Sequence, residues 1–233
     1  MSKSSKKEEV REMFNDISPK YDFLNHFLSF GIDRAWRRKL VGLLKSKNPV
    51  TVLDVATGTA DLAIKIASSG PQKIVGIDIS EKMLEIGRLK IEEKGLTGII
   101  SLQCADAEKI PFSDNSFEAV TVAFGVRNYE NLEAGLAEMK RVLRPGGTML
   151  ILEFSHPGSF PMKQLYSVYS KFVIPVLGRW ISGNSKAYSY LPESVAAFPS
   201  GKPFLGILQK LGLRNARQIS LSMGIASIYL AEK

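Results

Sequence analysis

Short, almost continuous apolar runs alternate with longer amphipathic stretches through the middle of the chain. The apolar runs are Thr51–Val55, Lys73–Asp78, Gly98–Gln103, Ser116–Phe124 and Thr148–Phe154. Their length and β-branched content predict strands, and the stretches between them predict helices. This alternation is typical of βαβ units in a parallel sheet whose strands are covered on both faces.

Apolar residues at helical spacing predict three helices within this core. The first covers Thr59–Ser68, and the second begins after Ser80, its expected N-cap, and ends near Gly95. The third covers Tyr129–Leu143, and the segment Arg144–Gly147 (RPGG) is expected to stop it.

Further elements flank the core. Residues 6–47 have the pattern of helical pieces, broken at Asn15–Pro19, with Asp33 as the N-cap of the last piece. Near the other end, Gly201–Gly212 predicts a helix, and Arg217–Glu232 predicts two strands that form an antiparallel hairpin at one sheet edge.

The composition is that of an ordinary globular protein, with 233 residues, of which 45% are hydrophobic and 23% charged. The sequence lacks an 18-residue apolar run and an apolar secretory segment at its start. One cysteine, Cys104, fits a reducing compartment, and we expect it to be a small buried residue. These features predict a cytoplasmic protein.

The net charge of +8 is unevenly distributed. Residues 1–50 carry 11 basic and 6 acidic groups (+5), residues 51–155 carry 11 and 15 (−4), and residues 156–233 carry 9 and 2 (+7). Basic flanks suggest an anionic partner, a membrane or a nucleic acid. Solubilising lysines explain the same charge equally well.

The stretch TVLDVATGTADLAI places a glycine-poor turn after the first strand. The dinucleotide-binding pattern has three glycines there, but this chain has Ala56, Gly58 and Ala60. A pyrophosphate needs the backbone very close, and the two alanines hinder that approach. The turn therefore favours a nucleoside ligand without phosphates, such as S-adenosylmethionine, over a nicotinamide dinucleotide.

Acidic residues stand at the ends of the first three strands: Asp54, Asp78 and Asp106. Asp78 follows Gly58 by 20 residues, where a carboxylate can accept both ribose hydroxyls, and Asp106 is placed to accept from an adenine amino group. Three carboxylates would repel a pyrophosphate but suit a sulfonium cation. The alternative is that each aspartate only caps the next element.

Six segments together resemble the menaquinone/ubiquinone biosynthesis C-methyltransferases, over essentially the whole chain. They are KYDFLNHFLSFGIDRAW, DVATGTADLA, DAEKIPFSDNSF, AFGVRN, RVLRPGGTMLILEFS and YLPES. The resemblance implies an α/β fold, a Rossmann-like class I S-adenosylmethionine-dependent methyltransferase sheet, mainly parallel with an antiparallel hairpin at one edge. The chain departs from the family pattern at Leu24, Asp33 and His156.

The resemblance also implies methyl transfer to a ring carbon of a prenylated naphthoquinol or benzoquinol. We expect conversion of demethylmenaquinol to menaquinol. The alternatives are a dual ubiquinone/menaquinone C-methyltransferase and a methyltransferase for another small aromatic substrate. We expect no nucleic-acid partner, because no segment of this sequence has the pattern of an RNA-binding appendage.

Carried over by position, the resemblance implies cofactor contacts beside Gly58 of the turn. The residues are Thr57, Asp78, Asp106 and Ala107, with Ala123 nearby. Tyr21 and Asn25 are expected to close over the cofactor, with core packing as the alternative for Tyr21. No metal site is expected.

Arg127 and Asn128, in AFGVRN, are the expected catalytic residues. Carbon methylation needs a ring made electron-rich by loss of a hydroxyl proton, and Arg is too basic to accept that proton. We therefore expect Arg127 to bind the developing oxyanion and Asn128 to orient the ring. An ion pair of Arg127 with an acid such as Glu130 is the alternative. Candidates for the general base are Glu153 and His156.

We expect one methyltransferase domain, residues 1–233. Its parts are a helical N-terminal lid (1–48), a cofactor-binding core (50–155), a substrate-side insertion (156–203), and a helix with the closing hairpin (204–233). In the insertion, an aromatic stripe from Met162 to Trp180 could form an apolar channel for the polyprenyl tail, opening at an anionic membrane. Packing of the stripe on the sheet is the alternative.

Overall fold

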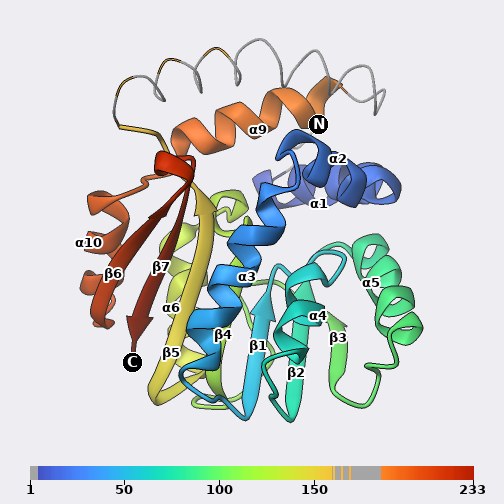
Figure 1. Ribbon diagram of the computed structural model, residues 1–233, viewed down its shortest axis with the longest axis vertical. Helices are drawn as coiled ribbons and strands as arrows, with labels where there is room; N and C mark the ends of the chain where they lie inside the picture. The colour runs from blue at the N-terminus through green and yellow to red at the C-terminus, as the bar shows by residue number, and fades with distance from the viewer. Residues whose placement is uncertain (1–4, 159, 161–163, 165–167, 169–184) are drawn as a thin grey trace.

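The computed structural model describes residues 5–158, 160, 164, 168 and 185–233 (Figure 1). Within these residues, seven strands form one sheet in the order β3-β2-β1-β4-β5-β7-β6. The strands are β1 (Thr51–Val55), β2 (Lys73–Asp78), β3 (Ile100–Cys104), β4 (Phe117–Ala123), β5 (Leu143–Phe154), β6 (Arg214–Leu221) and β7 (Ala226–Glu232). The first five run parallel, and β7 pairs antiparallel with both β5 and β6. The predicted sheet and its closing hairpin are confirmed.

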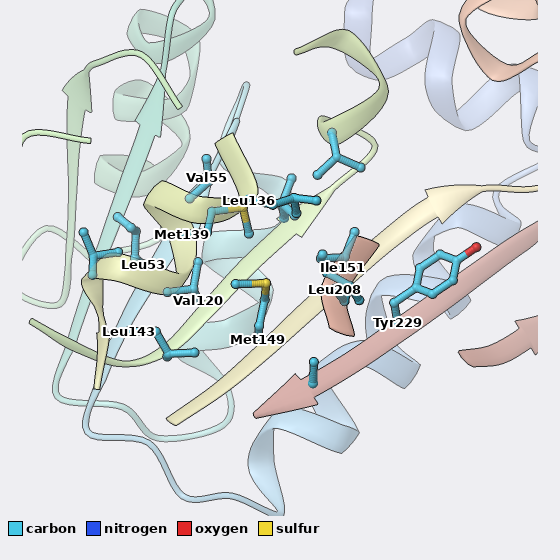
Figure 2. Packing of buried hydrophobic residues seen from close by; sticks show 14 of the residues in the cluster. Leu53, Val55, Val120, Leu136, Met139, Leu143, Met149, Ile151, Leu208 and Tyr229 are labelled. Atoms are coloured by element: carbon cyan, nitrogen blue, oxygen red, sulfur yellow. The ribbon is translucent and has the colours of Figure 1, made fainter. Parts of the chain in front are cut away.

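Helices cover both faces of this sheet. They are α1 (Lys6–Ile17), α2 (Tyr21–Leu28), α3 (Ile32–Lys45), α4 (Asp61–Ala67), α5 (Glu81–Glu93), α6 (Leu132–Val142), α9 (Ser185–Ala197) and α10 (Lys202–Lys210), with short 3-10 turns η1 (Ser18–Lys20), η2 (Val126–Asn128) and η4 (Ser222–Gly224). Buried residues of α3, α4 and α5 form one core against the sheet, and those of α6 and α10 form the other. Figure 2 shows part of the second core.

The two cores explain the continuous apolar runs. On β1, Leu53 and Val55 belong to the core of α6 and α10, whereas Val52 belongs to the core of α3 to α5. Successive side chains of a strand point to opposite faces, so a strand covered on both faces must be apolar at every position. All three side chains are fully buried.

The parallel strands end at one edge of the sheet, and helices cross that edge. Figure 1 shows α1, α2 and α9 lying above the carboxyl ends of the strands. Ligands of open α/β sheets bind at this edge. The helical arrangement predicted for residues 6–47 is confirmed, and its first two helices stand where a ligand would bind.

Several local predictions are wrong. Gly31, with φ of 72°, is the N-cap of α3, whereas Asp33 lies inside the helix and pairs with Arg37. The preceding helix does end before Arg144–Gly147, at Val142, but the strand begins at Leu143 rather than Thr148, so this segment belongs to β5, whose pairing with β4 shifts register there. Cys104 is exposed rather than buried.

The predicted aromatic stripe from Met162 to Trp180 lies largely outside the described residues, and so does the side chain of Asn25. In the parts of the chain that the structure describes, no helix is long and apolar enough to cross a membrane.

Candidate active site

The turn after β1 keeps a glycine-like backbone although two of its glycines are replaced. Ala56, Gly58 and Ala60 have φ values of 51°, 57° and 65°. The left-handed region is unfavourable for alanine by about 1–2 kcal/mol per residue. The tertiary structure therefore imposes this turn on the two alanines, as is typical of backbone next to a ligand site.

Asp78 is held rigidly beside this turn. Its Oδ2 accepts from the backbone N of Gly58 at 2.8 Å, and its Oδ1 accepts from the backbone N of Ser80 at 2.9 Å. Burial raises the pKa of Asp78, and the backbone donors of Ser80 and Gly58 oppose that rise. A carboxylate oxygen can accept more than one hydrogen bond, so Asp78 retains capacity for a ligand hydroxyl.

Asp106 follows β3 and is contacted by the N-terminal helix. Its Oδ1 accepts from the backbone N of Glu108 at 2.9 Å, and Lys7 Nζ lies 2.6 Å from its Oδ2. The hydrogen bond to Asp106 raises the pKa of Lys7, which also lies 3.3 Å from Glu108. The adenine-side carboxylate predicted from the sequence is therefore paired with a lysine 99 residues away.

These residues surround one pocket at the carboxyl edge of the sheet. Of the predicted site residues, its lining includes Gly58, Asp78, Asp106, Ala107, Ala123 and Asn128. Lys7, Val10 and Phe14 of α1 also line it, as does Tyr21 at the start of α2. Sequence reasoning identified the helical cover and Tyr21 but missed the α1 residues, whose helical pattern KKEEVREMFN carries no motif for a ligand.

Thr57 and Asp54 form a buried polar pair beneath the turn. The Thr57 hydroxyl donates to Asp54 Oδ2 at 2.6 Å, and the Thr121 hydroxyl donates to Asp54 Oδ1 at 2.7 Å. Asp54 is 1% exposed, and burial raises its pKa to about 6. Neither residue is among those that line the pocket. Asp54 therefore supports the turn from behind rather than facing a ligand.

Arg127 forms a buried ion pair with Glu153, not with Glu130. Its Nη1 lies 2.7 Å from Glu153 Oε1 and also donates to the backbone O of Phe124 at 2.5 Å. The guanidinium carbon lies 5.3 Å from the centre of the Phe154 ring. These contacts hold the arginine beside Asn128, which lines the pocket.

The two candidates for a general base lie away from the pocket lining. Glu153 is fully buried and accepts from Arg127 and from the backbone N of Phe154 at 2.9 Å. Burial raises its pKa, and the charge of Arg127 opposes the rise. His156 is exposed, and its backbone O is near Gly224 in the turn between β6 and β7. Glu153 is thus engaged by Arg127, and His156 lies on the surface, outside the pocket lining.

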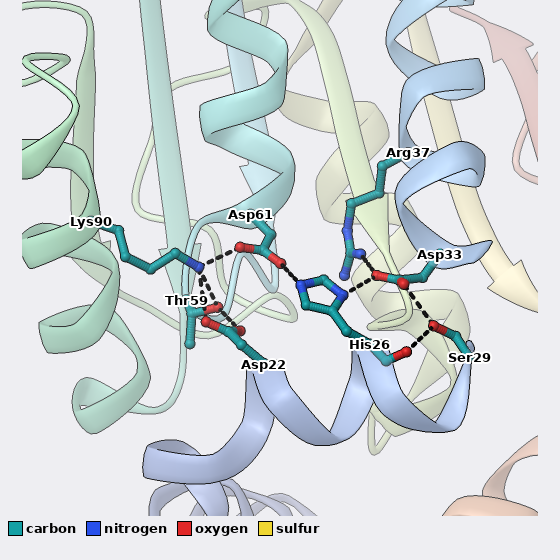
Figure 3. A network of polar contacts seen from close by, with 8 residues as sticks. All are labelled: Asp22, His26, Ser29, Asp33, Arg37, Thr59, Asp61 and Lys90. Carbon is teal, nitrogen blue, oxygen red and sulfur yellow. Dashed lines mark hydrogen bonds and ion pairs between the residues drawn. The ribbon is translucent and has the colours of Figure 1, made fainter. Parts of the chain in front are cut away.

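A network of charged groups fastens α2 to the pocket turn (Figure 3). The Thr59 hydroxyl, in the turn, donates to Asp22 Oδ1 at 2.5 Å. Lys90 of α5 contacts Asp22 Oδ2 at 2.9 Å and also pairs with Asp61 at the start of α4. Tyr21, the neighbour of Asp22, is thereby held over the pocket.

The same network continues into α3. His26 Nδ1 lies 2.9 Å from Asp33 Oδ2, and its Nε2 lies 3.6 Å from Asp61 Oδ2. Asp33 also accepts from Ser29 at 2.6 Å and pairs with Arg37. Although burial raises the pKa of Asp33, the Ser29 hydroxyl and the Arg37 charge lower it overall. The network joins four helices around one side of the pocket.

The sheet order and the position of the pocket are those of the class I methyltransferase fold. Solved structures share this fold. A SAM-dependent methyltransferase from Thermotoga maritima matches with a TM-score of 0.67 at 17% identity, covering 96% of this chain and 99% of that one. Another from Aquifex aeolicus matches with a TM-score of 0.56 at 22% identity, covering 78% and 81%.

The chain belongs to the ubiE/COQ5 methyltransferase family, whose model matches residues 2–233. A demethylmenaquinone methyltransferase from Bacteroides fragilis is 47% identical over 229 residues, covering 98% of this chain and 94% of the relative. A ubiquinone/menaquinone biosynthesis C-methyltransferase from Geotalea daltonii is 47% identical over 232 residues, covering 99% and 98%. This membership implies S-adenosylmethionine as the methyl donor.

The pocket fits such a cofactor. A Cβ added to Gly58 would meet Met83 and Tyr21 at 3.8 and 3.9 Å, inside the pocket, so the absence of a side chain leaves room for a ligand beside the turn. Carboxylates at Asp78 and Asp106 supply acceptors for ribose hydroxyls and an amino group. Among the described residues that line the pocket, Lys7 is the basic one, and it is paired with Asp106 and Glu108. The lining therefore does not offer the basic groups that a pyrophosphate would need.

Proposed function

We propose that this protein transfers a methyl group from S-adenosylmethionine to a ring carbon of demethylmenaquinol, giving menaquinol. The observation that carries the proposal is the 47% identity, over 98% of the chain, with a relative named demethylmenaquinone methyltransferase. The pocket supports it, because Asp78 and Asp106 line it as acceptors for the cofactor. Asn128 also lines it, and the buried Arg127, a donor for an oxyanion, is the neighbour of Asn128 just behind that lining.

The cofactor supplies an electrophilic methyl group when it is bound. Asp78 and Gly58 would hold its ribose, Asp106 and Ala107 its adenine, and Ala123 would lie alongside. Thr57 would act indirectly: its hydroxyl donates to Asp54 at 2.6 Å, and this pair supports the turn that contacts the cofactor. Tyr21 and α1 would exclude water from above, because their side chains line the same pocket.

Arg127 and Asn128 act on the quinol. Loss of a hydroxyl proton to water makes the neighbouring ring carbon nucleophilic. That carbon forms the new C–C bond while the carbon–sulfur bond of the donor breaks, and loss of the ring proton restores aromaticity. Arg127 stabilises the oxyanion by its charge, and Asn128 orients the ring. Glu153 holds Arg127 in place through the 2.7 Å contact rather than acting as the base.

A transfer assay tests this proposal. Purified protein is incubated with labelled S-adenosylmethionine and a short-chain demethylmenaquinol, with the matching demethyl benzoquinol alongside. The oxidised quinones are the control, because they have no hydroxyl to ionise and should take no label. Label in the naphthoquinol supports the proposal. If neither quinol takes label although calorimetry shows that the cofactor binds, the proposed substrate is wrong and the proposed cofactor site still stands.

The second candidate function is dual specificity for naphthoquinols and benzoquinols. Relatives named ubiquinone/menaquinone biosynthesis C-methyltransferase match this chain at 46–47% identity, as closely as the demethylmenaquinone methyltransferases do. Comparable turnover of both quinols in the same assay would establish this alternative.

The prenyl tail of the substrate would bring the protein to a membrane. Residues 156–233 carry 9 basic and 2 acidic groups (+7), which favours peripheral contact with an anionic surface. Flotation with vesicles containing anionic lipid should recover the protein at low salt and release it at high salt. Failure to float at low salt would contradict the contact.

A further inference from the structure

Buried polar atoms without a hydrogen-bond partner occur in η2 and in α9. Four buried side-chain atoms lack a hydrogen-bond partner among the residues that the structure describes: Arg37 Nε, Arg127 Nε, Asn128 Oδ1 and Tyr190 Oη. Buried polar groups in proteins almost always have a partner, so each exception needs an explanation. Three of the four belong to η2 and α9.

These three atoms belong to elements that pack together. Helix α9, which carries Tyr190, contacts η2, which carries Arg127 and Asn128. In Figure 1, α9 lies over the carboxyl end of the sheet. The Arg127 side chain is 8% exposed, so bulk water does not satisfy its free Nε.

The rest of each side chain is fixed. Arg127 uses Nη1 for Glu153 and Phe124, and Asn128 Nδ2 donates to the same Phe124 carbonyl at 3.4 Å. The atoms without partners are therefore not mobile ends that could turn to solvent. They form a set of two donors, from Arg127 and Tyr190, and one acceptor, from Asn128.

We propose that Tyr190 binds the substrate, and that its hydroxyl, Arg127 Nε and Asn128 Oδ1 together recognise one ring hydroxyl of the quinol. A ring hydroxyl has the complementary set, because its oxygen accepts two hydrogen bonds and its proton makes one. When that proton leaves, the donors from Tyr190 and Arg127 face an oxyanion, to which hydrogen bonds are stronger.

The environment keeps Tyr190 in its donor form. Burial raises the pKa of its hydroxyl, the nearby charge of Arg127 lowers it, and that of Glu153 raises it. The net direction is upward, so Tyr190 is protonated at neutral pH and can donate. This inference rests on the proposed function, since it names the residue that would select a hydroxylated aromatic ring.

The test is Tyr190→Phe, which removes the hydroxyl and keeps the ring. We expect kcat/KM for the quinol to fall about 10- to 100-fold, the loss typical of one hydrogen bond to a charged group. The dissociation constant for S-adenosylmethionine should change less than twofold. The Tm should not fall, because the hydroxyl has no partner to lose in the described structure.

Tyr229→Phe is the matched control. The Tyr229 hydroxyl accepts from the backbone N of Gly201 at 2.7 Å, so this variant should lose Tm and keep its kcat/KM. A lower Tm for Tyr190→Phe, or unchanged kcat/KM with active wild-type protein, would overturn the role of Tyr190. Inactive wild-type protein would instead overturn the proposed function, so the two failures are distinguishable.

Discussion

Arg127 Nη1 lies 2.7 Å from Glu153 Oε1, and Glu153 is completely buried. The two residues are 26 positions apart: Arg127 lies in η2, after β4, and Glu153 lies near the end of the neighbouring strand β5. The pair fixes the arginine that we propose as the oxyanion-binding residue, and it makes the charge of each partner depend on the other.

Arg127→Lys should separate these two roles. Lysine keeps a positive charge for Glu153 but lacks the Nε donor, so we expect turnover to fall about 100-fold with cofactor affinity unchanged. Arg127→Ala should also lower the free energy of unfolding by about 3–5 kcal/mol, because it leaves Glu153 as an uncompensated buried charge. Steady-state kinetics and urea unfolding measure the two effects. A double change of Arg127 and Glu153 to Met should recover stability without activity; recovery of activity would contradict the oxyanion role.

Gly58→Ala should weaken cofactor binding as well as lower stability. The added Cβ would enter the pocket between Met83 and Tyr21, so we expect affinity for S-adenosylmethionine to fall about tenfold or more, the effect of about 1.4 kcal/mol. The φ of 57° adds a strain of about 1–2 kcal/mol. Gly146→Ala, with φ of 77° and open space around its Cβ, carries the same kind of strain away from the pocket. Calorimetric titration should show weak binding for the first variant alone.

Lys7→Met should strengthen cofactor binding. Lys7 Nζ contacts Asp106 Oδ2 at 2.6 Å, and a cofactor amino group at that oxygen must compete with it. We expect the dissociation constant for S-adenosylmethionine to fall about 2- to 5-fold, in keeping with a partly exposed ion pair of up to about 1 kcal/mol. Arg11→Met, an exposed position on the same helix, is the control. Weaker binding by Lys7→Met would mean that the lysine helps to hold the cofactor.

Asp54 should make stability depend on pH. Its pKa is raised by burial from 3.8 to about 6, so between these values the folded state binds more protons than the unfolded state. The contribution of Asp54 to the free energy of unfolding is therefore greatest below pH 4 and falls as pH rises to 6, by roughly 3 kcal/mol. Urea unfolding of wild type and Asp54→Asn across this range measures it as a difference. A difference that stays constant from pH 4 to 6 would rule out the effect.

The sheet and part of the lining of the candidate site could be predicted because their signals are local. Strands β1 and β2 have the predicted bounds, and Ser80 caps α5 as expected, because its hydroxyl oxygen accepts from the backbone N of Met83. Gly58, Asp78 and Asp106 follow successive strands, so a parallel sheet necessarily brings them to one edge. The local pattern placed the end of α6 correctly but not the start of β5, which includes Arg144–Gly147 although this segment has the residues of a loop.

The sequence by itself determined the alternation of strands and helices, the acidic strand ends and the family, because periodicity and motifs are properties of neighbouring residues. The tertiary structure alone decided which charges meet. Lys7 reaches Asp106 across 99 residues, Arg127 pairs with Glu153 rather than Glu130, and Asp54 turns inward to two threonines. These pairings depend on how the helices pack over the edge of the sheet and on which polar groups become buried. The spacing of residues along the chain does not determine either of these.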